Sequence, residues 1–87
     1  MDKDGAKLQV ADSTEEQLLE LYLSLSNKDR AERFGDTRHA AQLTGVSVRT
    51  IQFWIETGMI RAIAIGNRYR VDLYSVREYL KQHISAR

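Results

Sequence analysis

The chain has 87 residues, a formal net charge of +1, 43% hydrophobic residues and 29% charged residues. This length allows one domain with a modest core, and the composition is ordinary for a globular protein. Cysteine is absent, which excludes disulfides and thiolate metal sites. No stretch approaches membrane-spanning length and the N-terminus lacks the apolar core of a signal peptide, so we expect a cytoplasmic protein without a membrane partner.

The charge is divided unevenly along the chain. Residues 1–36 contain five basic and nine acidic residues (net −4), whereas residues 37–87 contain eight basic and three acidic residues (net +5). Seven of those eight basic residues are arginine, whose planar guanidinium donates two hydrogen bonds at once to phosphate or guanine. This pattern favours a nucleic-acid-binding module behind an acidic segment, although a mixed solvated surface would have the same composition.

The first 36 residues are expected to add a helix to the domain that follows. Residues 1–12 are small and polar and predict a flexible N-terminus. Residues 13–36 predict a helix from about residue 14 to residue 26, followed by a charged connection. One helical turn over residues 29–33, closed by Gly35, fits this connection.

The predicted N-terminal helix carries more apolar side chains than one buried stripe needs. Its apolar arc is roughly 200° wide, with Leu19 and Leu23 outside the main stripe. The stripe itself, which we expect to face the protomer's own core, consists of Leu18, Leu21, Tyr22 and Leu25. We therefore expect a homodimer held by Leu19 and Leu23. The alternative is that a small domain wraps this helix more completely.

Residues 37–58 predict two short helices joined by a tight turn at Gly45, which supplies the positive φ that a sharp helix stop needs. Thr37 is expected to cap the first helix, over about 37–44, and Ser47 the second, over about 47–57. Two helices joined in this way form a helix-turn-helix, whose second helix enters the DNA major groove.

The second helix of this motif has two different faces. Ile51, Trp54 and Ile55 fall on the apolar side. The opposite, exposed side consists of Arg49, Gln52, Phe53 and Glu56. Arg49 suits guanine and Gln52 suits adenine, although Arg49 is also explained as a plain surface charge. Glu56 is expected at the groove edge, because phosphate repels a carboxylate.

Residues 59–72 predict a β-hairpin, with a wing over about 61–71. A two-residue loop, Gly66-Asn67, would pair isoleucines with arginines: Ile65 with Arg68 and Ile63 with Arg70. A three-residue loop, 66–68, instead pairs Ile65 with Tyr69 and Ile63 with Val71, and places Arg70 beside Ala62 and Ala64. Because the buried face sets the register, we expect the three-residue loop, with Arg68 at the tip.

Asp72 is expected to cap the last helix, over about 73–84, which completes a winged domain at 37–84. The expected core of this domain is Ala41, Leu43, Val46, Ile51, Trp54, Ile63, Tyr69, Val71, Val76 and Leu80.

From Ala40 to Leu80 the chain resembles the winged helix-turn-helix of the MerR-like excisionase family. The matching segments are AAQLTGVSVRTIQFWIETGMI, RAIAIGNRYRVD and SVREYL. The resemblance implies a mainly α fold with a small β-hairpin, to which this chain adds an N-terminal helix. It also implies that Phe53 lies along the sugar-phosphate backbone and that the wing, at 66–70, lies on the flanking minor groove. The expected DNA contacts are Thr37, Arg38, Ser47, Arg49, Thr50, Gln52, Phe53, Asn67, Arg68 and Arg70.

Two classes of function fit these features. The first is sequence-specific binding of double-stranded DNA, by a small transcriptional regulator, an excisionase-type recombination directionality factor or a phage packaging component. The second is a protein-interaction adaptor that keeps the fold without binding DNA. Three arginines on the recognition helix and wing, Arg49, Arg68 and Arg70, favour the first class.

The expected partners are double-stranded DNA, a second copy or a cooperative array on DNA, and a recombinase or the transcription machinery, in a nucleoid-associated protein. We expect no cofactor or metal, and no small-molecule effector because no long effector domain follows the last helix. His39 and His83 lie on different predicted helices, and no cysteine or carboxylate pair completes a catalytic set, so we expect no enzyme activity.

Overall fold

The computed structural model describes residues 15–85, so the expected flexible N-terminus at 1–12 lies outside the described residues. The elements in chain order are an N-terminal helix (residues 15–24), α2 (Asn27–Arg33), β1 (Phe34–Gly35), α3 (Thr37–Thr44), α4 (Val48–Glu56), β2 (Ala62–Ile65), β3 (Arg68–Asp72) and α5 (Leu73–Ser85). The predicted fold class, a mainly helical winged helix-turn-helix with an added N-terminal helix, is confirmed.

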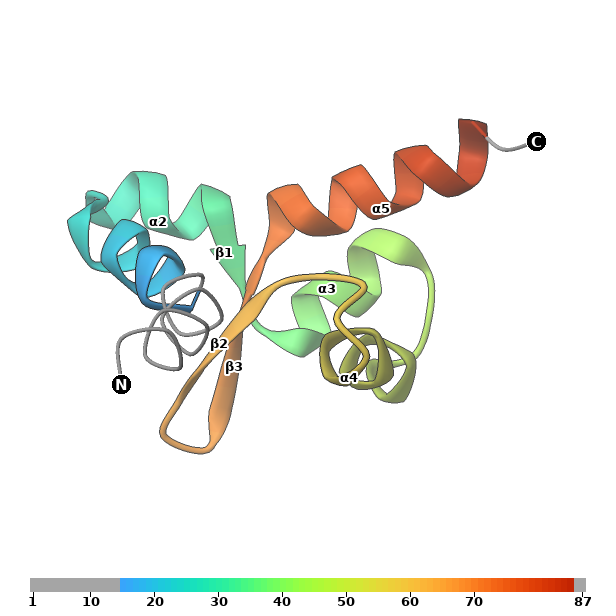
Figure 1. Cartoon of the computed structure of the whole chain (residues 1–87), viewed down its shortest axis with the longest axis horizontal. Helices are drawn as coiled ribbons and strands as arrows, with labels where there is room; N and C mark the ends of the chain where they lie inside the picture. Colours follow the sequence, from blue (N-terminus) through green and yellow to red (C-terminus); the bar gives the residue numbers. More distant parts are fainter. Residues whose placement is uncertain (1–14, 86–87) are drawn as a thin grey trace, which may run out of the picture.

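The three strands form one small antiparallel sheet in the order β1-β3-β2. The sheet lies in the middle of the molecule, with the N-terminal helix and α2 on one side and α3, α4 and α5 on the other (Figure 1). The sheet therefore joins the N-terminal segment to the helix-turn-helix.

The expected three-residue hairpin loop is wrong. Ile65 pairs with Arg68 and Ile63 with Arg70, so that the loop contains only Gly66 and Asn67. Gly66 has φ +63°, and no residue other than glycine has positive φ among those described. Glycine at the first position of a two-residue loop is the type II′ arrangement, whose twist matches that of the two strands.

The structure has the pairing of isoleucines with arginines that the sequence argument rejected. This pairing is possible because both faces of the hairpin are covered near its base. Val71 is buried on the face toward the helix-turn-helix, while Ile63 is only 6% exposed on the other face. Arg70 shares the face of Ile63, not that of the alanines, because directly opposed residues point the same way. The three-residue loop was expected because only one face of the hairpin was assumed to be buried, and this assumption is wrong.

Two clusters of buried side chains hold the structure together. The larger lies between the helix-turn-helix, the hairpin and α5, and contains Ala40, Ala41, Ile51, Ile60, Val71, Leu73 and Val76. The smaller lies under the N-terminal helix and contains Leu18, Phe34 and Ile63. Two residues of the expected winged core differ from prediction: Ile63 belongs to the smaller cluster and Leu43 is 58% exposed. The N-terminal helix is thus part of the fold, since it supplies the cover for Ile63.

The segment after the N-terminal helix is a helix over Asn27–Arg33, where a charged connection with one helical turn over residues 29–33 was expected. Ser26 caps α2 by accepting from the backbone N–H of Asp29 at 3.1 Å. The Arg30 guanidinium donates to the carbonyls of Tyr22 and Leu25 at 2.7 and 2.8 Å, which satisfies the free end of the preceding helix. Gly35 does not close a helix, because it pairs with Val71 in the sheet.

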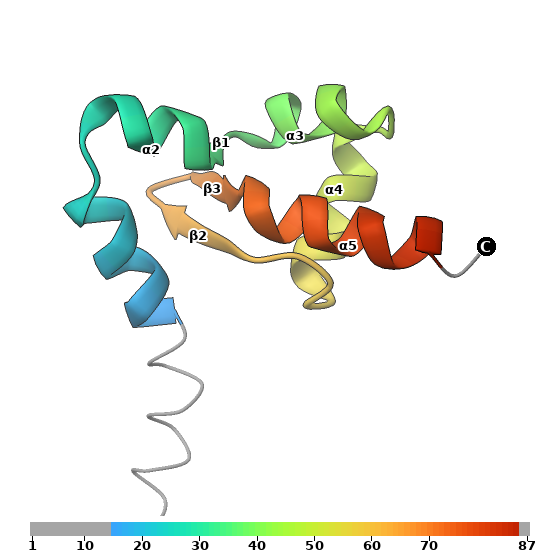
Figure 2. The same ribbon diagram turned by 90° about the horizontal axis from the view of Figure 1, so that it is seen from above.

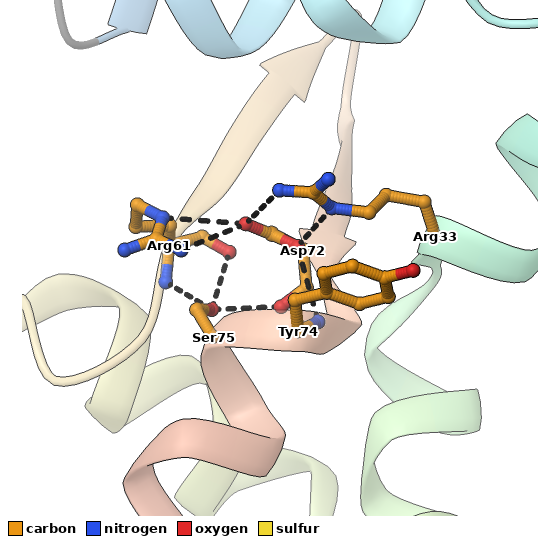
Figure 3. A network of polar contacts seen from close by, with 5 residues as sticks. All are labelled: Arg33, Arg61, Asp72, Tyr74 and Ser75. Atoms are coloured by element: carbon orange, nitrogen blue, oxygen red, sulfur yellow. Dashed lines mark hydrogen bonds and ion pairs between the residues drawn. The ribbon is translucent and has the colours of Figure 1, made fainter.

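A polar cluster around Asp72 joins α2, β3 and α5 to the segment just before β2 (Figure 3). The Asp72 side chain is fully buried and accepts from Arg33 at the end of α2 and from Arg61 just before β2. It also accepts from the backbone N–H of Tyr74 in the first turn of α5, at 3.1 Å. The Ser75 hydroxyl accepts from the Arg61 backbone N–H at 2.8 Å and donates to the Asp72 carbonyl at 2.7 Å. The sequence predicted the capping role of Asp72 but neither arginine partner.

Candidate nucleic-acid interface

The helix-turn-helix begins with a carboxylate cap. Asp36 accepts from the His39 backbone N–H at 2.7 Å, so the expectation that Thr37 caps α3 is wrong, and Thr37 is the first helical residue. Aspartate is a stronger N-cap than threonine, and its carboxylate reaches the free N–H of the first turn. Asp36 is exposed on the surface that α3 shares with the wing.

The turn and the start of the recognition helix are formed as predicted. Gly45 has φ +78° and its N–H donates to the Ala41 carbonyl at 2.8 Å. Ser47 caps α4 by accepting from the Thr50 backbone N–H at 3.1 Å. The hydroxyls of Ser47 and Thr50 also lie 3.1 Å apart, so these two expected DNA contacts hydrogen-bond to each other at the entrance of α4.

Five of the expected DNA contacts line one hollow of about 470 Å³ between α3, α4 and the hairpin. We call this hollow the binding face. The five residues are Thr37, Arg38, Gln52, Asn67 and Arg68. Asp36, Val48 and Tyr69 line it as well. Segments that are far apart in sequence therefore meet on one side of the molecule.

Arg49 and Phe53 lie on the adjacent strip of α4, outside the lining of the hollow. Both side chains are exposed, and Phe53 is 57% exposed although it is a large aromatic residue. A four-residue step places them one above the other along the helix. Glu56 continues this strip toward the end of α4. The exposed surface of α4 thus consists of a strip with Val48 and Gln52 beside the wing, and a strip with Arg49 and Phe53 farther out.

The wing residues divide into an exposed tip and a half-buried base. Asn67 and Arg68 are exposed, and Arg68 begins β3, although it was expected inside the loop. Arg70 is half-buried, and its Nε atom is buried without a hydrogen-bond partner. Arg70 therefore lies farther from the tip than Arg68.

The arginines of this surface are not neutralised by ion pairs. Among the described residues, the carboxylate of Asp72 is the only one within 4.0 Å of a basic side chain, and it pairs with Arg33 and Arg61. The hydrogen bond from the His39 N–H lowers the pKa of Asp36, burial opposes this shift, and the charges of Arg70 and Arg38 strengthen it. The binding face thus combines several free guanidinium groups with one ionised carboxylate.

Sequence reasoning missed three residues of the binding face: Asp36, Val48 and Tyr69. Asp36 was recognisable, because aspartate directly before a predicted helix start is a preferred cap. Tyr69 was not, since the wrong hairpin register placed its side chain opposite Ile65, although Ala64 is its partner.

Other kinds of site have little support in the described part of the chain. Residues 15–85 bring no three His, Cys, Asp or Glu side chains together in a metal-binding group. Within the same range, every helix is too short or too polar to cross a membrane.

Comparison with known families matches residues 36–84 to a family model described as a helix-turn-helix domain. This range is more than half of the 87-residue chain and includes α3, α4 and the whole hairpin. Comparisons with curated proteins and with solved structures give no significant match. Because helix-turn-helix domains of this kind bind DNA, the matched range and the binding face lead to the same conclusion: the chain belongs to the helix-turn-helix domain family and is a DNA-binding protein.

Proposed function

We propose that the protein recognises a specific site on double-stranded DNA, with α4 in the major groove and the tip of the hairpin on the adjacent minor groove. The hollow that joins α3, α4 and the wing tip carries this proposal, because one duplex laid against it meets Arg38, Gln52 and Arg68 together. Arg49 is offered to guanine and Gln52 to adenine, the bases whose major-groove edges they fit. Arg68 lies where a narrow, A·T-rich minor groove attracts a guanidinium.

The remaining polar residues are proposed to hold the backbone of the duplex. Thr37 and Arg38 stand in the first turn of α3, where the Thr37 hydroxyl and the Arg38 guanidinium are offered to phosphate beside the Asp36 cap. Ser47 is the N-cap of α4 and Thr50 lies in its first turn. Phe53 lies along the sugar-phosphate backbone, Asn67 contacts the minor groove, and Arg70 supports the wing from its base. Contacts of this kind set the register of the protein on DNA without reading its sequence.

The process we propose is that of a small transcriptional regulator or an excisionase-type recombination directionality factor. One winged helix-turn-helix reads only a short stretch of base pairs, so a useful site needs two copies or several in a row. Leu19 and Leu23 are 38% and 62% exposed on the N-terminal helix, and we propose that they form the contact between two copies. The partner would be a recombinase or the transcription machinery.

Selection from a random duplex library, followed by chemical interference on the selected site, tests this assignment. Methylation at guanine N7 blocks the major groove, whereas methylation at adenine N3 blocks the minor groove. We expect guanine interference at the centre of each half-site and adenine interference at its flank.

Two variants then assign the base contacts. Arg49→Ala and Gln52→Ala should each cost about 1–3 kcal/mol on the selected site and relax its sequence preference. Lys81→Ala serves as the control, because Lys81 is an exposed residue of α5 and does not line the binding face. Equal loss on selected and unrelated duplexes would show that Arg49 is a phosphate contact and refute its role as a base reader.

A further inference from the structure

The outer edge of β2 carries no strand among the described residues. In the order β1-β3-β2, β3 is paired on both sides, whereas β2 is paired on one side only. A two-residue hairpin loop makes Ile65 and Arg68 a hydrogen-bonded pair, so that the alternate residues of β2 direct their backbone groups outward. These residues are Ala62 and Ala64. No hydrogen bond within residues 15–85 satisfies their outward N–H and C=O groups.

β2 contains none of the lysine or proline residues that commonly protect a free strand edge. Edge strands are commonly blunted by lysine, proline, a bulge or a covering loop. β2 has the sequence Ala-Ile-Ala-Ile, and Ala64 and Ile65 are both exposed. The small alanine side chains leave the backbone of the edge accessible to another chain.

Two hollows run along this edge and meet at Glu15 and Ala64. We call them together the edge groove; their volumes are about 400 and 350 Å³. Figure 2 shows β2 between the N-terminal helix and α4. Residues of these two helices line the groove. One wall presents Glu15 and Glu16 from the N-terminal helix, beside Leu19, which is also one of the two leucines of the proposed dimer contact. The other presents Ile55 and Glu56 from α4, with Ile60 and Tyr69 beside them.

The charge of the edge groove excludes nucleic acid and selects a basic occupant. Glu15, Glu16 and Glu56 are exposed, and no basic side chain of the described residues lies within 4.0 Å of any of them. The one arginine that lines the groove, Arg61, is paired with Asp72. Three carboxylates without a basic partner in residues 15–85 repel phosphate and attract lysine and arginine.

We infer that the edge groove docks an extended basic peptide segment of a partner protein, which adds to β2 as a further strand. Side chains alternate along a strand, so one set faces each wall of the groove. The basic set meets Glu15 and Glu16, and the apolar set packs on Ile55, Ile60 and Tyr69. Backbone hydrogen bonds to Ala62 and Ala64 supply affinity, and the two walls supply specificity. Tyr69 is the one lining residue that the edge groove shares with the binding face.

Titration of the full chain with a capped peptide, Lys-Val-Arg-Leu-Lys-Val-Lys, tests this inference. We expect amide shift changes at residues 62–65 and slowed hydrogen exchange at Ala62 and Ala64, since the added strand protects their N–H groups. The same peptide with glutamate in place of each basic residue should not bind. Binding of both peptides with equal affinity, or shift changes confined to α3 and α4, would overturn the proposal.

Variants of the full chain separate backbone pairing from charge. Ala64→Pro removes one outward N–H without touching the β3 ladder, and should weaken peptide binding about tenfold while duplex binding is kept. Glu15→Gln/Glu16→Gln/Glu56→Gln should also weaken it severalfold, whereas the charge-matched Glu20→Gln/Glu32→Gln/Glu78→Gln should not. Equal effects of the two triple variants would refute the charged wall. If the wild type sediments as a dimer and Ala64→Pro makes it a monomer, the edge belongs to a second copy and the proposal is wrong.

Discussion

The Nε atom of Arg33 lies 2.9 Å from Oδ1 of Asp72, although 39 positions separate the two residues in sequence. Arg33 ends α2 and Asp72 ends β3, so this ion pair fastens the N-terminal segment to the junction of the wing and α5. The guanidinium of Arg33 also stacks on the Tyr74 ring at 4.1 Å from its centroid. The N-terminal helix, the wing and the last helix are therefore expected to unfold together.

Asp72→Ala should lower the free energy of unfolding by about 3 kcal/mol, because it leaves two arginines without their buried partner. Arg33→Ala should cost less, about 1 kcal/mol, since Arg61 remains on the carboxylate. Urea unfolding measures both. Arg49→Ala, an exposed arginine with no ion pair to a described residue, is the control and should change stability by under about 0.5 kcal/mol. Equal effects of Asp72→Ala and Arg49→Ala would contradict the structural role of Asp72.

The cover that the N-terminal helix gives the hairpin can be tested with two isoleucines on the same face of β2. Ile63 is 6% exposed and Ile65 is 42% exposed. Ile63→Ala should therefore cost about 2–3 kcal/mol in unfolding free energy, and Ile65→Ala under about 1 kcal/mol. Hydrogen exchange should show that Ile63→Ala also loosens the N-terminal helix, which it contacts through Leu18. Similar costs at both positions would mean that the N-terminal helix does not cover the hairpin.

The cap of α3 predicts an acid-dependent contribution to stability. The folded-state pKa of Asp36 lies below its ordinary value of 3.8, chiefly because of the His39 N–H. The ionised cap therefore stabilises the fold fully above that ordinary value, and the contribution is lost as the pH falls through the folded-state pKa. Asp36→Asn keeps a cap that does not titrate, so its unfolding free energy should fall less than that of the wild type on acidification. An identical pH profile for both chains would refute this assignment.

The same residue affects DNA. Asp36→Asn removes a negative charge from the binding face, and should tighten binding to an unrelated duplex about threefold at low salt. Glu32 lies on the opposite side of α3, beside Leu43 and Leu73. Glu32→Asn removes the same charge there and should change the affinity for the unrelated duplex less than Asp36→Asn does.

The proposed dimer is tested by Leu19→Glu/Leu23→Glu. Both side chains are exposed on one protomer, so the variant should fold and sediment as a monomer that binds a single half-site weakly. Leu18→Glu is the contrast, because Leu18 is buried and a charge there should unfold the N-terminal helix. A wild type that sediments as a monomer at tens of micromolar would refute the dimer. Unfolding of the double variant would show that these leucines face the protomer's own core.

The local signals in this sequence were sufficient for the helix-turn-helix. Gly45 ends α3 through its positive φ, and Ser47 caps α4 through its side chain. Both effects involve residues within a few positions, so the sequence alone shows them. The hairpin register and Asp72 were harder, because both depend on partners far along the chain. Ile63 is paired with an arginine only because Leu18 and Phe34 cover it, and nothing near residue 63 indicates that cover. In the sequence, Arg33 and Arg61 likewise cannot be told from ordinary surface charges, because only the folded chain places them beside Asp72.

Affinity for the selected duplex, measured as a function of salt concentration, is the most direct test of DNA binding by the face between α3, α4 and the wing. Roughly 4–6 phosphate contacts from these elements predict a log–log slope of about −4 to −5 per protomer. Arg38→Ala and Arg68→Ala, whose side chains line the binding face, should each reduce this slope by about 1. A slope near zero, or no binding at low salt, would contradict DNA binding by this surface.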